Sequence, residues 1–470
     1  MPHPTIIQGG MGAGVSDWRL AQAVSTYGQL GVVSGTALDS ILARRLQLGD
    51  EGGHMRRALE HFPVPEMAEH ILEAYYIPGG KPADKMFSLV PMYTADPDDH
   101  LLELTILGNF VEVFLAKEGH DAPVGINYLE KIQMPHLPSM YGAMLAGIDY
   151  VIMGAGIPRE IPGALDSLSQ HQPASLNLHI EEVTKEDNFQ LSFDPKELMP
   201  KELPPLKRPD FLAIVASATL AISLARKSTG KVNGFVIEGP TAGGHNAPPR
   251  GAMQLSDQGE PIYGPRDEVE LDKIKKLGLP YWIAGGYARP EKLQEVLDGG
   301  GAGIQVGTAF FLCEESGVDA EVKAQLLEKL RDEEIAIFTD PVASPTNFPF
   351  KIVPLEGTLS QDEVYQNRGR ICDLGYLQIP YKKEDGTVAY RCPSEPVKNF
   401  AKKGGEGEEV EGRKCLCNAL MANIGLGQVR RNGAEKPLLT AGNDINMVRR
   451  FLQNGKTTYS ASEVLDYLLS

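Results

Sequence analysis

Residues 234–245 read GFVIEGPTAGGH, a short apolar run that passes directly into a glycine-rich loop and ends on a histidine. Apolar runs of this length are typical of buried strands, and glycine lets a loop backbone approach a flat or anionic ligand closely. Imidazole titrates near neutral pH, so His245 at such an edge is suited to moving protons. The stretch therefore predicts a strand that ends at the rim of an active site.

Seven further apolar runs show a similar organisation, and segments with helical periodicity separate most of them. The eight expected strands are 5–8, 30–34, 124–128, 150–153, 211–217, 234–238, 281–284 and 303–306. The expected helices are 17–27, 101–117, 138–146, 218–227, 267–277 and 290–298, the first of them behind a cap-like Ser16. Alternating strands and helices predict a parallel sheet with crossover helices.

An eight-stranded (β/α)8 TIM barrel is the simplest α/β fold for this order, with a doubly wound open sheet as the alternative. Glycine and polar residues follow nearly every expected strand, as at Gln8-Gly9-Gly10, Gly285-Gly286 and Gly307-Thr308. In a barrel these carboxyl ends converge on one face, which is where active sites lie. This convergence favours the barrel.

Three segments exceed a minimal barrel. We expect residues 1–337 to form the barrel, with inserts at about 38–97 and 172–208, and residues 338–470 to form a partly helical, cysteine-containing extension packed on it.

The two inserts have different patterns. The first holds a helix-like stretch at 64–76 and a strand-like stretch at 87–93, and it is expected to form either a lid over the barrel mouth or an edge element. The second holds two stretches of alternating hydrophobicity, at 175–182 and 189–193, which predict an inserted hairpin.

Composition narrows the class of protein. The 470 residues carry a net charge of −17, which disfavours nucleic acid and anionic membranes as partners. No apolar run approaches the roughly 20 residues of a membrane span, and the amino terminus lacks the pattern of a signal peptide. A cytoplasmic enzyme acting on a small molecule is the expectation, and a homo-oligomer stays open.

Four of the five cysteines fall in the extension, at Cys372, Cys392, Cys415 and Cys417. Four thiolates can hold zinc or an iron–sulfur cluster. The irregular spacing, with a Cys-x-Cys in place of paired Cys-x-x-Cys motifs, favours free buried thiols instead. We therefore expect no metal.

Five motifs occur together in a specific order: Gln8-Gly9-Gly10-Met11-Gly12, Gly125-Ile126-Asn127, Ala242-Gly243-Gly244-His245, Ala284-Gly285-Gly286 and Gln305-Val306-Gly307-Thr308. In this order the chain resembles the FMN-dependent nitronate monooxygenases, formerly called 2-nitropropane dioxygenases, over roughly residues 4 to 330. Related flavin enoyl-thioester reductases share most of the set. The extension resembles, more weakly, the trans-acting enoyl reductases of polyunsaturated fatty acid and polyketide synthases.

The resemblance implies roles for individual residues. His245 matches the family's catalytic base. The glycines and Thr308 after the last two strands match the loops that hold the FMN phosphate, which agrees with the phosphate sites of barrels in general. The implied flavin-binding set is Gly9, Gly10, Met11, Asn127, Ser217, Gly243, Gly244, Gly285, Gly286, Gly307 and Thr308.

Two positions depart from the family pattern. Thr241 stands where the nitronate enzymes usually carry glutamate, and Ser217 stands where many relatives supply a lysine to the cofactor. Both changes remove charge near the flavin and leave the substrate class open. Arg250 follows the histidine loop and is a candidate contact for an anionic substrate, with a solvated loop arginine as the alternative.

The resemblance implies an oxidoreductase and monooxygenase that binds FMN and oxidises alkyl nitronates or nitroalkanes with molecular oxygen. His245 would take the α-proton of a nitroalkane or orient a nitronate. The alternative enzyme is an NAD(P)H-dependent enoyl-thioester or quinone reductase in which His245 donates a proton. No Gly-x-Gly-x-x-Gly fingerprint supplies a separate dinucleotide domain, so NAD(P)H as an electron donor would have to bind over the flavin face, which favours the nitronate reaction. Two further readings, a non-catalytic barrel and a barrel that binds a phosphorylated metabolite without flavin, also remain.

Overall fold

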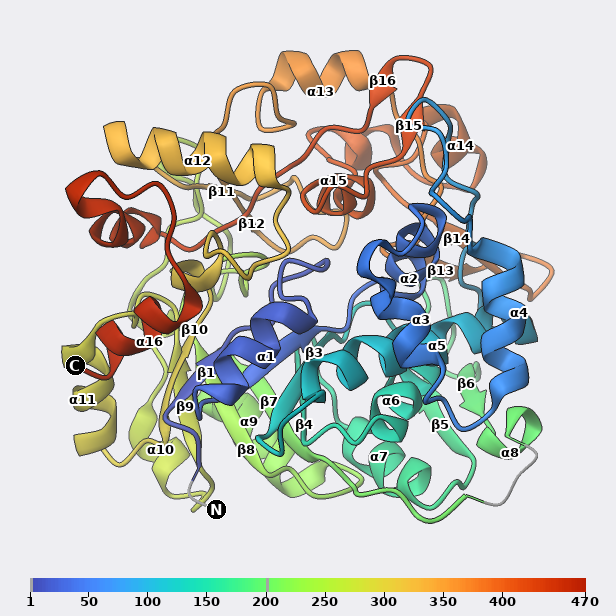
Figure 1. Cartoon of the computed structure of the whole chain (residues 1–470), viewed down its shortest axis with the longest axis horizontal. Helices are drawn as coiled ribbons and strands as arrows, with labels where there is room; N and C mark the ends of the chain where they lie inside the picture. The colour runs from blue at the N-terminus through green and yellow to red at the C-terminus, as the bar shows by residue number, and fades with distance from the viewer. Residues whose placement is uncertain (1–2, 200–202) are drawn as a thin grey trace.

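Eight parallel strands close into a barrel at the centre of the computed structural model, which describes residues 3–199 and 203–470 (Figure 1). The strand order is β1-β10-β9-β8-β7-β4-β3-β2, and a bridge between Ile7 and Leu30 connects β1 to the chain entering β2. The strands are β1 (Ile6–Gln8), β2 (Gly31–Ser34), β3 (Val124–Leu129), β4 (Tyr150–Gly154), β7 (Asp210–Val215), β8 (Gly234–Glu238), β9 (Tyr281–Ala284) and β10 (Gly303–Val306). The predicted TIM barrel is confirmed, and the open-sheet alternative is wrong.

Helices lie between or after these strands, largely as expected. They are α1 (Trp18–Thr26), α5 (Asp99–Lys117), α6 (His136–Leu145), α7 (Ile161–Ser169), α9 (Ala218–Lys227), α10 (Leu271–Lys275), α11 (Pro290–Asp298) and α12 (Ala320–Asp332). The helix predicted over 267–277 is shorter, since a 3₁₀ turn at Pro265–Asp267 precedes α10 without joining it.

The cap of α1 differs from the prediction. Asp17, not Ser16, is the N-cap, because its carboxylate accepts hydrogen bonds from the backbone N–H groups of Arg19 and Leu20 at 2.9 and 3.4 Å. Ser16 Oγ instead accepts the backbone N–H of Met11 at 2.9 Å. It therefore shapes the loop after β1 rather than the helix.

Alternation along the strands divides their side chains between two cores. One set packs in the barrel interior, and the intervening residues, such as Phe235 and Ile237 of β8, face the surrounding helices. The buried interior residues are Ile7, Leu30, Val32, Ile152, Leu212, Val236, Trp282 and Ala284. This parity determines which side chain of each strand enters the mouth of the barrel.

The first insert is mainly helical. It contains α2 (Leu38–Gln47), the 3₁₀ turn η1 (Glu51–Gly53), α3 (His54–Leu59) and α4 (Pro65–Tyr75), and α2, α3 and α4 pack against α5. The strand predicted over 87–93 is wrong, because this segment pairs with no strand among residues 3–199 and 203–470. Side-chain amides satisfy its backbone instead: Phe87 N donates to Gln428 Oε1 at 2.7 Å, and Ser88 N donates to Gln47 Oε1 at 2.6 Å.

The second insert forms the predicted hairpin. Its antiparallel strands are β5 (Ala174–Asn177) and β6 (Gln190–Phe193), followed by α8 (Pro195–Leu198). The first strand is shorter than expected because the backbone after Leu178 bonds outside the hairpin: His179 N donates to Gln133 Oε1 at 2.8 Å, and Glu181 N donates to Pro380 O at 2.9 Å.

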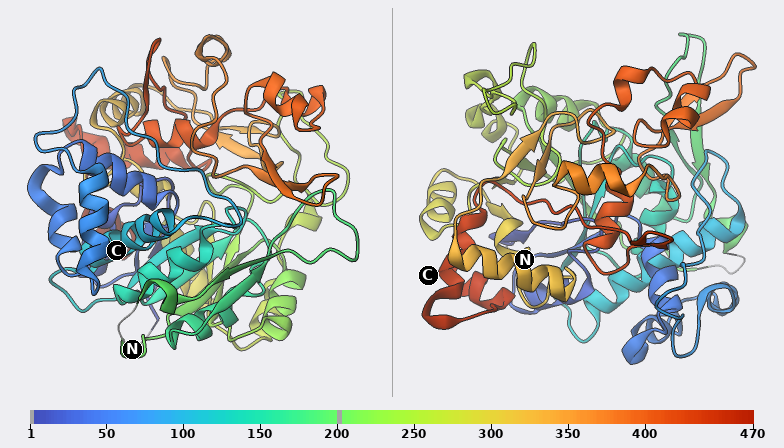
Figure 2. Two further views of the ribbon diagram at one scale, coloured as in Figure 1. Left: turned by 90° about the vertical axis from the view of Figure 1, so that its right-hand side faces the viewer. Right: turned by 90° about the horizontal axis from the view of Figure 1, so that it is seen from above.

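The extension is built from short elements and lies on one side of the barrel, in orange and red in Figure 2. Its hairpins are β11 (Phe338–Asp340) with β12 (Phe350–Ile352), β13 (Ile379–Lys382) with β14 (Val388–Arg391), and β15 (Val429–Arg430) with β16 (Gly433–Ala434). Its helices are α13 (Asp362–Arg368), α14 (Val397–Lys402), α15 (Leu416–Ala422), α16 (Ala461–Leu468) and the 3₁₀ segment η5 (Ile445–Gly455). Because α16 packs on α1 and α11, the extension contacts helices from both the beginning and the end of the barrel segment of the chain.

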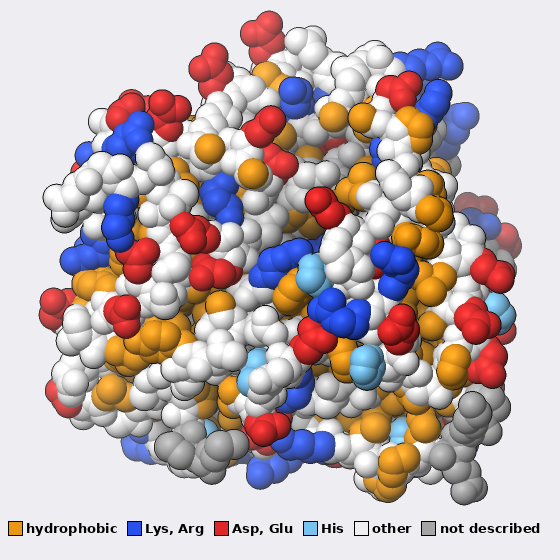
Figure 3. All heavy atoms as spheres, in the orientation of Figure 1, with side chains coloured by type: hydrophobic (Ala, Val, Ile, Leu, Met, Phe, Trp, Pro, Cys, Tyr) orange, Lys and Arg blue, Asp and Glu red, His pale blue; other side chains and the backbone are white. Residues whose placement is uncertain are grey.

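The surface mixes charges of both signs on the face shown in Figure 3. No helix in the part of the chain that the structure describes is long and apolar enough to cross a membrane.

Trp282 fills the barrel interior and supplies a test of this packing. It is fully buried, and its indole Nε1 donates to Pro4 O at 2.8 Å. Trp282→Ala should lower the free energy of unfolding by about 3–5 kcal/mol. Trp282→Phe keeps most of the apolar volume but loses the hydrogen bond to Pro4 O. It should lower the free energy of unfolding by only about 1 kcal/mol. Urea unfolding measures both, and equal losses for the two variants would contradict this assignment.

Candidate active site

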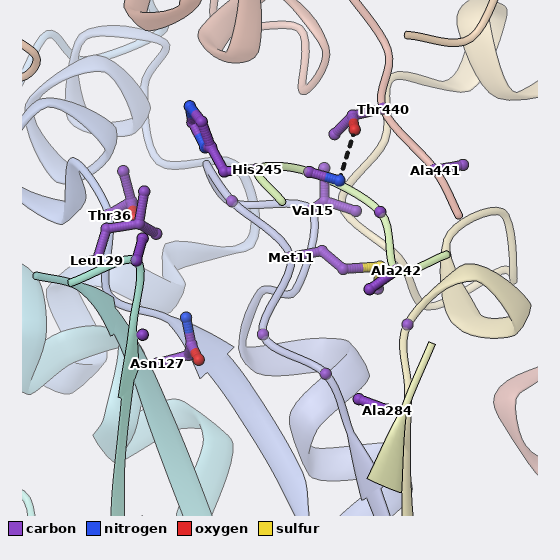
Figure 4. Close-up of a pocket in the computed structure, with 18 of the residues that line it drawn as sticks. Met11, Val15, Thr36, Asn127, Leu129, Ala242, His245, Ala284, Thr440 and Ala441 are labelled. Atoms are coloured by element: carbon purple, nitrogen blue, oxygen red, sulfur yellow. Dashed lines mark hydrogen bonds between the residues drawn. The ribbon is translucent and has the colours of Figure 1, made fainter. Parts of the chain in front are cut away.

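A cavity of about 240 Å³, here called the mouth cavity, opens where the strands end (Figure 4). Strand parity explains its floor, because most strands contribute an inward-facing residue at or near their ends. These residues are Asn127 of β3, Gly154 of β4, Ile214 of β7, Glu238 of β8, Ala284 of β9 and Gln305 of β10. In Figure 4, Asn127 and Ala284 lie near the strand ends, with Met11 between them and His245.

The mouth cavity brings together nearly all the site residues predicted from the sequence. They are Gly9, Gly10, Met11, Asn127, Gly243, Gly244, His245, Gly285, Gly286, Gly307 and Thr308. Ser217 lies elsewhere: it lines a neighbouring cavity, and its Oγ accepts the backbone N–H of Leu220 at 3.1 Å as the cap of α9.

The roof of the mouth cavity comes from the extension. Its lining residues there are Phe350, Tyr376, Leu377, Cys417, Leu420, Asn423, Thr440, Ala441 and Asp444. Two hydrogen bonds join the roof to the barrel loops: Gly244 N donates to Thr440 Oγ1 at 2.8 Å, and Gly442 N donates to Thr308 Oγ1 at 2.9 Å. The insert at 38–97, expected to be a lid or an edge element, contributes no residue to this cavity.

His245 is held by the extension as well. Its Nε2 lies 2.7 Å from Ser344 Oγ, and that hydroxyl lies 2.8 Å from Thr346 Oγ1. The ring of Phe350 packs against the imidazole at 4.9 Å between centroids. Burial lowers the pKa of His245 to about 4, so the imidazole is neutral near pH 7.

A short backbone pairing fixes the histidine loop to β12. His245 forms an antiparallel bridge with Phe350, Lys351 N donates to Gly244 O at 3.0 Å, and Asn246 N donates to Pro349 O at 2.9 Å. The position of the imidazole therefore depends on residues about a hundred positions later in the chain.

Two polar residues of the cavity floor were missed in the sequence analysis. The Oε1 atom of Gln305 is buried without a hydrogen-bond partner among the described residues. Glu238 has no side-chain partner there either, and burial raises its pKa to about 7. Both occupy inward-facing positions at strand ends, so the two-residue alternation of side chains along a strand could have identified them from the sequence.

The mouth cavity fits a flavin. Gln305 Oε1 is a free acceptor for a ring N–H. The glycine loops after β1, β9 and β10 expose backbone atoms along the cavity walls. The approach of the first loop requires glycine, since a Cβ at position 10 would lie 2.4 Å from Asn127 Cβ. Gly285 has φ +89°, a conformation that favours glycine.

A second cavity of about 420 Å³, here called the side cavity, adjoins the first. The two share Ala155, Ile214, Glu238 and His245 in their walls. Lys131 and Arg250 also line the side cavity, and Arg250 Nη2 donates to Ala216 O at 3.2 Å. Arg250 is thus placed beside the candidate site rather than in remote solvent.

Four cysteines surround a small separate cavity inside the extension. Cys372, Cys392, Cys415 and Cys417 line it, and all are free thiols. Burial raises the pKa of the Cys372 thiol to about 12, which keeps it protonated at neutral pH. Within residues 3–199 and 203–470, no group of three or more His, Cys, Asp or Glu side chains is arranged to hold a metal ion.

Gly243 tests the contact between the histidine loop and the roof. A Cβ there would lie 2.8 Å from the carbonyl carbon of Ala441 and from Gly442 N, whereas a Cβ at Gly239 in the same loop would meet nothing closer than 3.8 Å. Overpacking of about 1–3 kcal/mol should make Gly243→Ala bind FMN roughly 5- to 150-fold more weakly. Gly239→Ala is the matched control and should bind normally. Fluorescence titration of the apoprotein with FMN measures both, and normal binding by Gly243→Ala would refute the tight contact.

One family model matches part of the chain. Residues 175–344 match the family model described as nitronate monooxygenase. The matched segment contains β7 to β10 with the His245 loop and the glycine loops after β9 and β10. A search of the curated proteins found no match.

Several solved structures are similar to the chain at low identity. FabK from Thermotoga maritima has a TM-score of 0.47 and 14% identity, over 100% of this chain and 92% of that one. A nitroalkane oxidase from Streptomyces ansochromogenes has a TM-score of 0.46 and 15% identity, over 99% and 94%. The enoyl reductase domain of MlnA from Bacillus amyloliquefaciens has a TM-score of 0.48 and 11% identity, over 98% and 92%.

The match to the family model confirms the resemblance that the ordered motifs indicated. Residues 175–344 are similar to the nitronate monooxygenase family, and this match indicates an FMN-dependent oxidoreductase.

Proposed function

We propose that the protein oxidises alkyl nitronates or nitroalkanes with molecular oxygen, with FMN in the mouth cavity and His245 as a catalytic residue. The observation that carries this proposal is the position of His245, which lines both the mouth cavity and the side cavity. A substrate in the side cavity would therefore meet the imidazole at the boundary with the cofactor.

The proposed flavin site uses backbone more than charged side chains. Gln305 would accept from the ring edge, Asn127 and Met11 would contact the ring, and the loops at Gly285-Gly286 and Gly307-Thr308 would hold the phosphate. When bound, FMN supplies the redox chemistry, by taking electrons from the substrate and passing them to oxygen. The extension roof supports this role, because it covers part of the cavity and would limit the access of bulk water to the flavin.

The neutral state of His245 suits the binding of a nitronate. Ser344 Oγ accepts the backbone N–H of Thr346 at 3.2 Å, and in the proposed arrangement the Ser344 hydroxyl donates its hydrogen to His245 Nε2. Nδ1 would then carry the imidazole proton and donate it in a hydrogen bond to a nitronate oxygen. Lys131 and Arg250 in the side cavity add positive charge for an anionic substrate.

A reductase remains the second candidate because the side cavity offers room for another organic ligand beside the mouth cavity. In that reaction NAD(P)H would supply electrons, and an enoyl-thioester or a quinone would receive them. The residues proposed to bind the flavin are the same in both candidates.

An anaerobic absorbance titration separates the two candidates. Ethyl nitronate alone should bleach the flavin bands of the purified holoenzyme, because the proposed substrate is itself the electron donor. NADPH and NADH are added in separate cuvettes. Bleaching by a nicotinamide and not by the nitronate would reject the proposal in favour of the reductase.

His245→Ala tests the histidine. The variant should retain FMN but oxidise ethyl nitronate with a kcat/KM reduced by about 10²-fold or more, since it loses a directed hydrogen bond in a buried site. Ser344→Ala keeps the imidazole and removes only its hydroxyl partner, so it should show a smaller loss. Steady-state oxygen consumption measures both, and full activity of His245→Ala would reject the catalytic role.

A further inference from the structure

We propose that Glu238 is a second catalytic residue, which removes the α-proton from a neutral nitroalkane bound in the side cavity while His245 holds the nitro group. This inference rests on the proposed function and divides it into two steps. The conversion of nitroalkane to nitronate needs a base, whereas the oxidation of a nitronate supplied as such does not.

The strand register places Glu238 at the reacting position. Val236 packs in the barrel interior, and Glu238 lies two residues further along β8, so it has the same inward parity. It is paired with Ala284 of β9, which also lines the mouth cavity. Glu238 and His245 both line the mouth cavity and the side cavity, so a ligand at the boundary can touch both residues.

The Glu238 carboxylate has no structural partner among the described residues that would explain its position. Within residues 3–199 and 203–470, no hydrogen bond or ion pair engages its oxygens, and desolvation alone shifts its pKa. A partly buried carboxylate without a partner costs free energy of folding. Such a group at the boundary of two cavities is typical of functional sites.

Its surroundings make Glu238 the better base at neutral pH. Tyr263, Lys131, Arg250 and Asp267 line the same side cavity, but burial in the barrel mouth is what raises the pKa of Glu238 to about 7. Burial lowers the pKa of His245 to about 4. A base is most effective when its pKa lies near the working pH, which favours the carboxylate over the imidazole.

The proton-transfer step balances without any redox change. The C–H bond at the α-carbon breaks, and its electron pair becomes the C=N bond of the nitronate. The proton binds a Glu238 carboxylate oxygen, and one negative charge moves from Glu238 to the nitronate oxygens. Glu238 then returns the proton to water through the side cavity.

Glu238→Gln separates the two steps when the holoenzyme is assayed with two substrates. With freshly dissolved nitroethane, kcat/KM should fall by about 10²-fold or more, because the amide cannot accept the proton. With ethyl nitronate, turnover should stay within a few-fold of the wild type. Glu268→Gln is the matched control, since Glu268 is exposed and lies outside both cavities, and it should leave both activities unchanged.

The pH dependence identifies which group titrates. For nitroethane, kcat/KM of the wild type should rise as pH increases through about 7, because the carboxylate must lose its proton to act. A rise centred near 4 would instead indicate His245. Independently of activity, infrared difference spectra should show a carboxylic acid band that disappears as pH rises through about 7 and is absent from Glu238→Gln.

The outcomes distinguish the inference from the proposed function. Unchanged nitroethane turnover in Glu238→Gln, together with normal nitronate turnover, would overturn the role of Glu238 and leave the proposed function intact. Absence of turnover with both substrates in the wild type would overturn the proposed function itself. Equal losses on both substrates in Glu238→Gln would also overturn the inference, because Glu238 would then be needed after proton removal.

Discussion

Closure of the eight parallel strands is the constraint on which the rest of the molecule depends. The bridge between Ile7 and Leu30 joins the two ends of the strand order, so the inward side chains of every strand must share one interior. Large apolar residues such as Trp282 fill that interior, and inward positions near the ends of six strands then lie at the mouth. The chemistry of the site therefore follows from the parity of the strands.

The extension converts an open barrel mouth into a buried site. It contributes Thr440 and Ala441 to the roof and Ser344 and Phe350 to the environment of His245. Removal of water has opposite effects on the two acid–base groups, because burial disfavours the charged form of each. The imidazole becomes harder to protonate, and the Glu238 carboxyl becomes harder to ionise. One physical cause thus separates the two residues into different roles.

Sequence patterns predicted the local elements well where a strand is apolar and a glycine loop follows it. The strands 234–238, 281–284 and 303–306 have the predicted bounds, and the glycine loops after them line one cavity. The strand predicted over 87–93 failed because a strand-like stretch of sequence does not show whether a neighbouring strand exists. There, side-chain amides from Gln47 and Gln428 occupy the place of a ladder.

The sequence by itself determined the barrel, the order of its motifs and the histidine at the end of β8, because these depend on periodicity and on residues close together in the chain. Only the tertiary structure decided what covers the site: the extension forms the roof, and the insert at 38–97 does not. The partner of His245 lies 99 residues away at Ser344. Contacts over such separations, and the burial that shifts the pKa values of Glu238 and His245, arise from packing that no local pattern encodes.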